Sequence, residues 1–176
     1  MTAAKGRKPA NKARGSVRSR KDSGRENVDM LFREVAKRMA ALAGDEPGTA
    51  GETYDYAGTI GLLDQILALE PGNRNALVFR GIMYMGLGAS EKALASFNAV
   101  LKANPGDSEA LNNKAIALYG LGKAREAMEY VDRALEIDKR YADALMNKAV
   151  MLHDAGRTEE ARKYVARANA CDRIAP

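Results

Sequence analysis

The sequence is 176 residues long and carries a net charge of +5, with one Cys, one His and no Trp. A lone Cys excludes a disulfide framework and is typical of a reducing compartment, so we expect a cytoplasmic protein. A single His and a single Cys are too few for a His/Cys zinc site. The apolar runs fall short of the roughly 18 residues that indicate a membrane span.

The positive charge is concentrated at the N-terminal end of the chain. Residues 1–25 hold nine basic side chains and one acid, Asp22, which makes this segment +8 and leaves −3 for the rest. Its one large apolar residue after Met1 is Val17. Burial therefore cannot offset the entropy of ordering, and we expect residues 1–25 to be a disordered basic tail.

Three roles for this tail are open: non-specific nucleic-acid binding, attraction to an anionic membrane surface, and a merely solubilising segment. No aromatic residues are interleaved with the charges, so base stacking and sequence-specific recognition are not expected. The candidate polyanion-binding residues are Lys5, Arg7, Lys8, Lys12, Arg14, Arg18, Arg20 and Lys21.

The ordered part of the chain is expected to begin with a helix over residues 26–43. Apolar residues recur there at spacings of three and four, as on one face of a helix. Ser23 and Glu26 have the spacing of a capping box, Gly44 ends the helix, and residues 45–51 form a loop. The apolar stripe consists of Val28, Leu31, Phe32, Val35, Met39 and Leu42.

A second apolar stretch ends at Pro71 and predicts another helix, joined to the first by a long loop. The two helices would form one unit over residues 26–73. The apolar residues of the second stretch are Tyr56, Ile60, Leu63, Ile66 and Leu67.

From residue 74 onward the sequence repeats with a period of 34 residues, in the windows 74–107, 108–141 and 142–175. A fixed period of this length is the signature of a solenoid. The coinciding residues are Ala76, Ala110 and Ala144; Leu77, Leu111 and Leu145; Gly88, Gly122 and Gly156; and Ala93, Ala127 and Ala161.

Each window predicts a helix–turn–helix hairpin. Gly88 lies where the first helix must reverse, because glycine enters the left-handed conformation cheaply. Asn73 follows Pro71, and Asp107 follows Pro105, so that each is placed to cap the next helix.

The three windows resemble tetratricopeptide repeats. With residue 74 as position 1, the windows match the small residue at position 8, the Ala at position 20 and the apolar residue at position 24. The first window also has the Pro at position 32, as Pro105. The matching residues are Gly81, Ala115 and Ala149; Ala93, Ala127 and Ala161; and Phe97, Val131 and Val165.

The resemblance implies an all-α fold, a right-handed α-solenoid of helix–turn–helix units. It would have three clear repeats plus one degenerate N-terminal repeat within residues 26–73. We expect the small residues Gly81 and Ala93 to let the two helices of the first window approach closely. The departures from the family pattern are Lys139 and Arg173 at position 32 and Leu in place of Trp at position 4.

Position 7 is basic in all three windows, where the family is usually apolar. Either the methylene stems pack while the charges reach water, or the side chains form a basic ladder for an anionic ligand. The residues are Arg80, Lys114 and Lys148.

Positions 21 and 28 indicate where the stack ends. They are apolar in the first two windows and should pack on the following repeat, but they are polar in the last. We therefore expect a polar C-terminal face, the end of the stack and a monomeric protein. The residues are Leu94 and Leu101, then Met128 and Leu135, and finally Arg162 and Asn169.

The resemblance also implies a concave surface lined by the first helix of each repeat. Positions 2, 5, 9 and 12 form a stripe there that is apolar at its centre and acidic along one side. This favours a neutral, apolar or basic peptide or helix, of which the chain's own tail is one. The alternative is that Ile82, Ile116 and Val150 pack on the N-terminal helix or on the superhelix itself. The candidate groove residues are Asn75, Val78, Ile82, Met85, Glu109, Asn112, Ile116, Tyr119, Asp143, Met146, Val150 and His153.

One subfamily grips the acidic tails of chaperones with a carboxylate clamp of five basic and amide positions. Here those positions hold Val78, Ile82, Asn113, Asp143 and Asn147, and Asn113 alone agrees. We therefore do not expect this chain to bind chaperone tails.

No catalytic constellation is present. The GLGK segment at 120–123 lacks the leading Gly and the Ser or Thr of a phosphate-binding loop. His153 has no second His and no Cys nearby in sequence, and Cys171 has no obvious base. We expect no enzyme activity, no cofactor and no metal.

Two hypotheses result. In the first, the chain is an adaptor that binds a protein segment in its groove. In the second, it is a nucleic-acid- or ribosome-associated factor whose tail binds the polyanion while the repeats recruit a protein.

Overall fold

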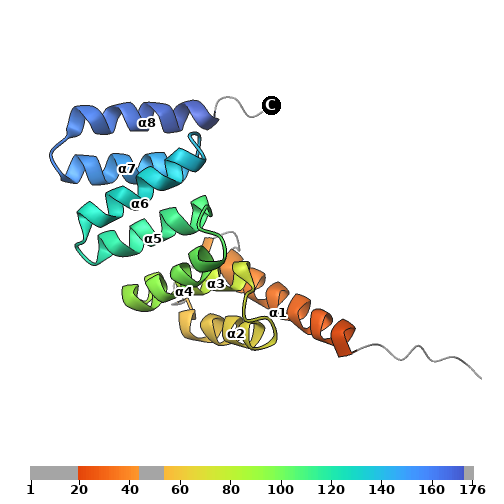
Figure 1. The fold of residues 1–176 in the computed structure, drawn as a ribbon. Helices are drawn as coiled ribbons and strands as arrows, with labels where there is room; N and C mark the ends of the chain where they lie inside the picture. Colours follow the sequence, from red (N-terminus) through yellow and green to blue (C-terminus); the bar gives the residue numbers. More distant parts are fainter. Residues whose placement is uncertain (1–19, 44–53, 173–176) are drawn as a thin grey trace, which may run out of the picture.

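The computed structural model describes residues 20–43 and 54–172, and these residues form eight α-helices and no β-strand. The helices stack in chain order, with successive helices running in opposite directions (Figure 1). Within the described ranges, no helix has the length and apolarity needed to cross a membrane. The helices are α1 (Arg20–Ala43), α2 (Tyr56–Leu69), α3 (Arg74–Gly86), α4 (Ser90–Ala103), α5 (Ser108–Gly120), α6 (Ala124–Ile137), α7 (Ala142–Asp154) and α8 (Thr158–Asp172).

The predicted all-α solenoid of helix–turn–helix units is confirmed. The first helix of each clear repeat begins at Arg74, Ser108 or Ala142, at intervals of 34 residues. The reversal inside each repeat falls on Gly88, Gly122 and Gly156, whose φ angles are +70°, +74° and +76°. Only glycine adopts this left-handed conformation without steric cost, so the same turn chemistry sets all three hairpins.

The predicted helix caps are confirmed at the first two repeats. The side chain of Asn73 accepts a hydrogen bond from the Ala76 amide, and that of Asp107 accepts one from the Ala110 amide. Each satisfies a donor that the first turn of a helix leaves unpaired. Tyr141, at the same place before α7, makes no side-chain cap.

Helix α1 begins earlier than the sequence pattern predicts. It starts at Arg20, so residues 20–25, which were expected to belong to the disordered tail, are helical. Ser23 lies inside the helix and is therefore not its N-cap. The other parts of the predicted tail and the 45–51 loop lie outside the described residues, as do the side chains of residues 20–23.

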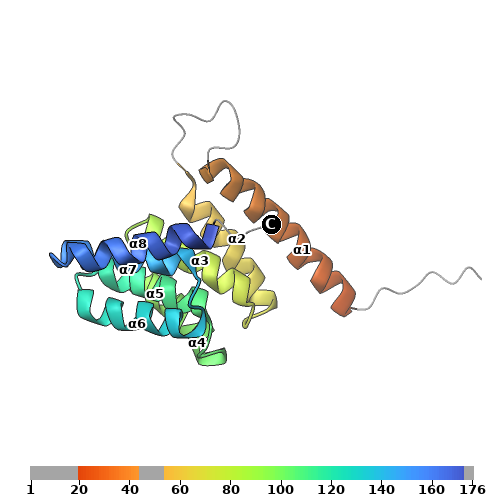
Figure 2. The same cartoon turned by 90° about the horizontal axis from the view of Figure 1, so that it is seen from above.

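Helices α1 and α2 pack against each other ahead of the three clear repeats. Val28 and Val35 of α1 are buried in one cluster with Leu63 and Ile66 of α2. Seen from above, α1 runs at an angle to the other helices and its N-terminal half extends past them (Figure 2). This cluster continues into α3, so the N-terminal helices form a single core with the first repeat.

The two helices of the first repeat approach each other closely at Gly81 and Phe97. A Cβ atom at Gly81 would lie 2.4 Å from the Phe97 ring, which is fully buried. In the next two repeats the same pair of positions is Ala115 with Val131 and Ala149 with Val165. A smaller residue on the first helix thus accompanies a larger one on the second.

The basic residues at position 7 have partners inside the molecule. Arg80 forms an ion pair with Asp64 at 2.8 Å, and Lys148 forms one with Asp132. The corresponding position for Lys114 is Asn98, and Lys114 instead donates a hydrogen bond to the hydroxyl of Tyr130 at 2.8 Å. All three side chains are half-buried, so the structure favours packing over a free basic ladder.

Candidate protein-binding groove

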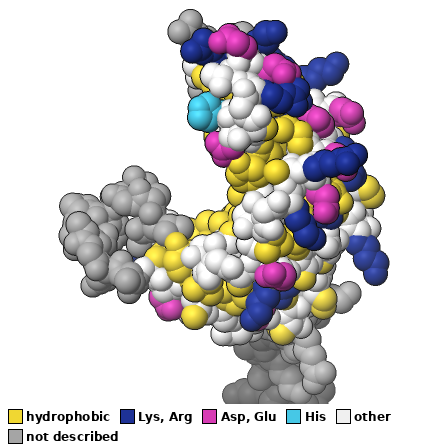
Figure 3. Space-filling model, turned by 90° about the vertical axis from the view of Figure 1, so that its left-hand side faces the viewer, with side chains coloured by type: hydrophobic (Ala, Val, Ile, Leu, Met, Phe, Trp, Pro, Cys, Tyr) yellow, Lys and Arg dark blue, Asp and Glu magenta, His cyan; other side chains and the backbone are white. Residues whose placement is uncertain are grey.

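The first helices of the three clear repeats share a concave face, and a cavity of about 410 Å³ lies along it. In the space-filling view, hydrophobic side chains collect on the hollowed side of the bent molecule, whereas charged side chains follow the opposite edge (Figure 3). We call this cavity the groove. Its residues come from α3, α5 and α7: Ile82, Glu109, Asn112, Asn113, Ile116, Tyr141, Asp143, Met146 and Asn147.

The helical period brings these residues onto one face. Positions three or four apart share a face of a helix, and a shift of 34 residues moves each position to the same face of the next repeat. Ile82, Ile116 and Met146 therefore form the apolar floor from three helices. About half of the predicted groove residues line the cavity: Ile82, Glu109, Asn112, Ile116, Asp143 and Met146.

The remaining predicted residues lie elsewhere. Asn75 is exposed at the start of α3, while Met85 and Tyr119 are half-buried against the repeat cores. Val150 and His153 are exposed farther along α7, where they line a second cavity together with α8.

Val78 was predicted to line the groove, and this is wrong. Its side chain is 1% exposed and belongs to the core formed by α1, α2 and α3. The reason is that α1 and α2 cover this end of α3. The groove is therefore shorter at its N-terminal end than the sequence pattern predicts.

An amide pair crosses the groove between α5 and α7. The Asn147 Nδ2 atom donates to the Asn112 Oδ1 atom at 2.9 Å. Asn112 is buried, so this bond fixes the spacing of the two helices. Within the described residues the side chain of Asn113 makes no such bond, and Asn113 lines the cavity. The Asn147 Oδ1 atom accepts no hydrogen bond from the part of the chain that the structure describes, so this oxygen and the Asn113 amide can bond to a ligand backbone.

The acidic side of the groove is less acidic than the sequence indicates. The Glu109 carboxylate forms an ion pair with Arg74 of the preceding repeat at 2.6 Å. Arg74 also binds Asp107 at 2.7 Å, and its guanidinium holds the pKa of Asp107 below its usual value. Asp143 makes no ion pair within the described residues and is exposed. One uncompensated carboxylate therefore remains at the rim.

Tyr141 closes the groove beside this carboxylate. Burial raises the pKa of the Tyr141 hydroxyl, and the nearby charges of Asp143 and Glu109 raise it further. The hydroxyl thus stays protonated at neutral pH and is a neutral polar group in the wall of the groove.

Three residues line the groove although the sequence pattern did not predict them there: Asn113, Asn147 and Tyr141. The two asparagines occupy position 6, adjacent to the position-5 stripe, and Tyr141 occupies position 34, the capping position. Polar residues at position 6 were an available signal, because Asn113 and Asn147 share the type and the slot.

His153 and Asp154 lie at the turn end of α7. The Tyr119 hydroxyl donates to an Asp154 oxygen, and the His153 Nδ1 atom lies 3.4 Å from the other oxygen. Both residues are exposed. Among the described residues, no group of three or more His, Cys, Asp or Glu side chains could hold a metal ion.

The polyanion-binding residues predicted in the tail cannot be placed in this geometry. Most of them lie outside the described residues, and at Arg20 and Lys21 only the helical backbone is described. Nucleic-acid binding by the tail therefore stays a prediction.

Comparison with known proteins identifies the repeat. A family model described as "Tetratricopeptide repeat" matches the chain over residues 52–108, 80–142 and 112–173. No curated protein sequence matches the chain.

Solved structures with the same fold include MamA 41-end from Desulfovibrio magneticus RS-1, with 19% identity and a TM-score of 0.64. The match covers 85% of this chain and 78% of that chain. The first repeat domain of Spaghetti (RPAP3), bound to the HSP90 peptide SRMEEVD, has 18% identity and a TM-score of 0.60, with 74% of this chain and 94% of that chain covered.

An O-GlcNAc transferase mutant from Thermobaculum terrenum has 19% identity and a TM-score of 0.62. The match covers 74% of this chain but 23% of the transferase chain. At these identities the similarities show the fold.

Proposed function

Because the chain belongs to the tetratricopeptide repeat family, we propose that it is a non-enzymatic scaffold that binds a segment of another protein in the groove. The observation that carries the proposal is the apolar floor of Ile82, Ile116 and Met146, of which Met146 is 41% exposed to water. Exposed apolar surface in a concave site, bordered by amides, is typical of peptide recognition.

The groove favours a short extended segment. Apolar side chains of the ligand would cover the floor, and its backbone would bond to the amides of Asn113 and Asn147. The carboxylate of Asp143 favours a Lys or Arg in the ligand and disfavours acidic residues. The ligand is therefore neutral, apolar or basic, and an acidic chaperone tail does not fit.

The residues at the five carboxylate-clamp positions also argue against binding of an acidic chaperone tail. Val78 is buried in the core, Ile82 is apolar, and Asp143 carries the charge that would repel a ligand carboxylate. The HSP90 peptide named for the RPAP3 structure contains two Glu and one Asp, so it has the opposite character to the ligand proposed here.

Selection from a random peptide library on the full chain tests this proposal. We expect the enriched peptides to combine apolar residues with Lys or Arg, and to lose their basic residues when the selection is repeated on Asp143→Lys. Enrichment of acidic peptides on the unchanged protein would contradict the proposed chemistry.

A further inference from the structure

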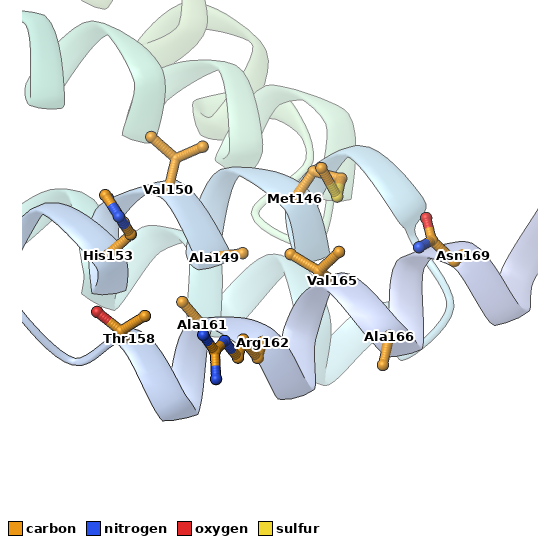
Figure 4. A pocket seen from close by; sticks show the side chains of 10 residues that line it. All are labelled: Met146, Ala149, Val150, His153, Thr158, Ala161, Arg162, Val165, Ala166 and Asn169. Atoms are coloured by element: carbon orange, nitrogen blue, oxygen red, sulfur yellow. The ribbon is translucent and has the colours of Figure 1, made fainter.

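A second cavity, of about 590 Å³, opens between α7 and α8 at the C-terminal end of the stack (Figure 4). We call it the terminal pocket. It shares Met146 with the groove, and its other lining residues all belong to α7 and α8. Most of its lining is apolar: Met146, Ala149 and Val150 from α7, and Ala161, Val165 and Ala166 from α8.

The repeat itself shows what shape of occupant fits the terminal pocket. One repeat earlier, the positions of Ala149, Val165 and Asn169 are held by Ala115, Val131 and Leu135. Those three residues are buried in one cluster with residues of α7, which lies across α5 and α6.

In the terminal pocket Ala149 is buried at 3% exposure, but the other two positions lack such a cover. Val165 is half-buried, Asn169 is exposed, and the neighbouring Val150 is 50% exposed. The surface that remains has the form of a helix-binding site, because the same surface one repeat earlier holds a helix.

The charge of the residues that line the terminal pocket indicates what charge a docked helix should carry. The ionisable residues that line the terminal pocket are Arg162 and His153, and no acid lines it. Arg162 makes an exposed ion pair with Glu159 at 2.8 Å, on the same helix. Such exposed pairs contribute little, so a carboxylate from a ligand can replace Glu159 as the partner.

We propose that the terminal pocket docks an amphipathic helix of a partner protein, with its apolar face on α7 and α8 and an acidic residue against Arg162. This binding site is additional to the groove and does not depend on it.

Two other occupants fit the charges less well. A second copy that docked through the same pocket would bring two Arg162 side chains to one interface, and like charges oppose each other. The basic tail of this chain would likewise bring positive charge to Arg162.

A helical copy of α7 provides a defined probe. The peptide spans residues 141–155, whose parent helix covers the equivalent surface one repeat earlier. A lactam bridge in place of Met146 and Val150, which are exposed in α7, would hold the short peptide helical. Within the protein, Met151 of α7 and Met128 of α6 line one cavity. Arg162 occupies the position of Met128 in the next repeat. If the peptide docks as α7 does, a charge placed at its position 151 would therefore face Arg162.

The experiment compares two peptides, Met151→Glu and Met151→Lys, by fluorescence anisotropy on the full chain at low salt. We expect the Glu peptide to bind about five- to tenfold more tightly, and the Arg162→Glu protein to reverse this order. Arg125→Glu, a matched change at a fully exposed arginine of α6, should leave the order unchanged.

Three results would overturn the proposal: no saturable binding of either peptide, the same order of affinity on Arg162→Glu, or a dimer of the unmodified chain by sedimentation velocity. The Ile116→Glu protein keeps the terminal pocket and should bind the peptide normally. Failure of the groove proposal therefore leaves this result unaffected.

Discussion

Replacing Gly81 with Ala tests whether the two helices of a repeat are matched in size. The new methyl carbon would lie 2.4 Å and 2.5 Å from two carbons of the Phe97 ring. Favourable carbon–carbon contacts lie at about 3.5–4.0 Å. Because Phe97 is fully buried, its ring cannot swing into solvent to make room.

The expected cost follows from two opposing effects. Overpacking a core of this kind costs about 1–3 kcal/mol, and Ala gains about 1 kcal/mol over Gly in a helix interior. We therefore expect Gly81→Ala to lower the free energy of unfolding by about 1 kcal/mol. Phe97→Val alone should cost more, about 2–4 kcal/mol, because it leaves a cavity.

The double variant recreates the Ala–Val pair that the other two repeats contain. Without the ring there is no clash, and the added methyl fills part of the cavity. The double variant should therefore be more stable than the sum of the single changes predicts, by about 1–2 kcal/mol.

Urea unfolding followed by circular dichroism measures the four proteins of this cycle. The matched control is Gly61→Ala on α2, where an added methyl meets nothing within 4 Å. It should stabilise the protein by up to about 1 kcal/mol. A coupling energy within about 0.5 kcal/mol of zero between positions 81 and 97 would refute the size-matching account.

Three further predictions concern charges and ends. Asp107→Asn keeps the cap but loses the charged contact with Arg74, and should cost about 1 kcal/mol at pH 7. Because the folded pKa of Asp107 is lowered from 3.8, its contribution is present above that pH and is lost as the pH falls through the folded value, so unfolding curves of the two proteins should converge in acid. Arg162→Leu with Asn169→Leu should promote self-association, and an unchanged mass by light scattering would contradict the terminal-face argument. Deletion of residues 1–19, which leaves α1 whole, should abolish salt-dependent nucleic-acid binding if the tail binds polyanions, whereas retained binding would rule that role out.

The repeat could be predicted from sequence because its signals are local. Gly88, Asn73 and Asp107 each act within one turn, and the 34-residue period fixes which helix faces meet. The start of α1 could not be predicted in this way. Its first residues carry charge and no apolar stripe, yet they extend a helix that packing has already nucleated, which costs little.

The groove was predicted in part, because its ends depend on contacts between distant segments. Val78 has the spacing of a groove residue, but the packing of α1 and α2 decides that it is buried. Similarly, the sequence predicts an unpaired carboxylate at Glu109, whereas in the structure Arg74, 35 residues earlier, forms an ion pair with it. The Asn112–Asn147 and Tyr119–Asp154 pairs have the same separation of 35 residues, one more than the repeat period. Polar residues at this separation are therefore the signal to examine.

The central claim is that the groove binds a protein segment through its apolar floor. Its most direct test is the affinity of one library-selected peptide for three proteins: the unchanged chain, Ile116→Glu in the groove, and Ile137→Glu at an isoleucine that is 51% exposed outside it. We expect Ile116→Glu to weaken binding at least about tenfold and Ile137→Glu to leave it unchanged. Equal affinity for all three proteins would contradict the claim.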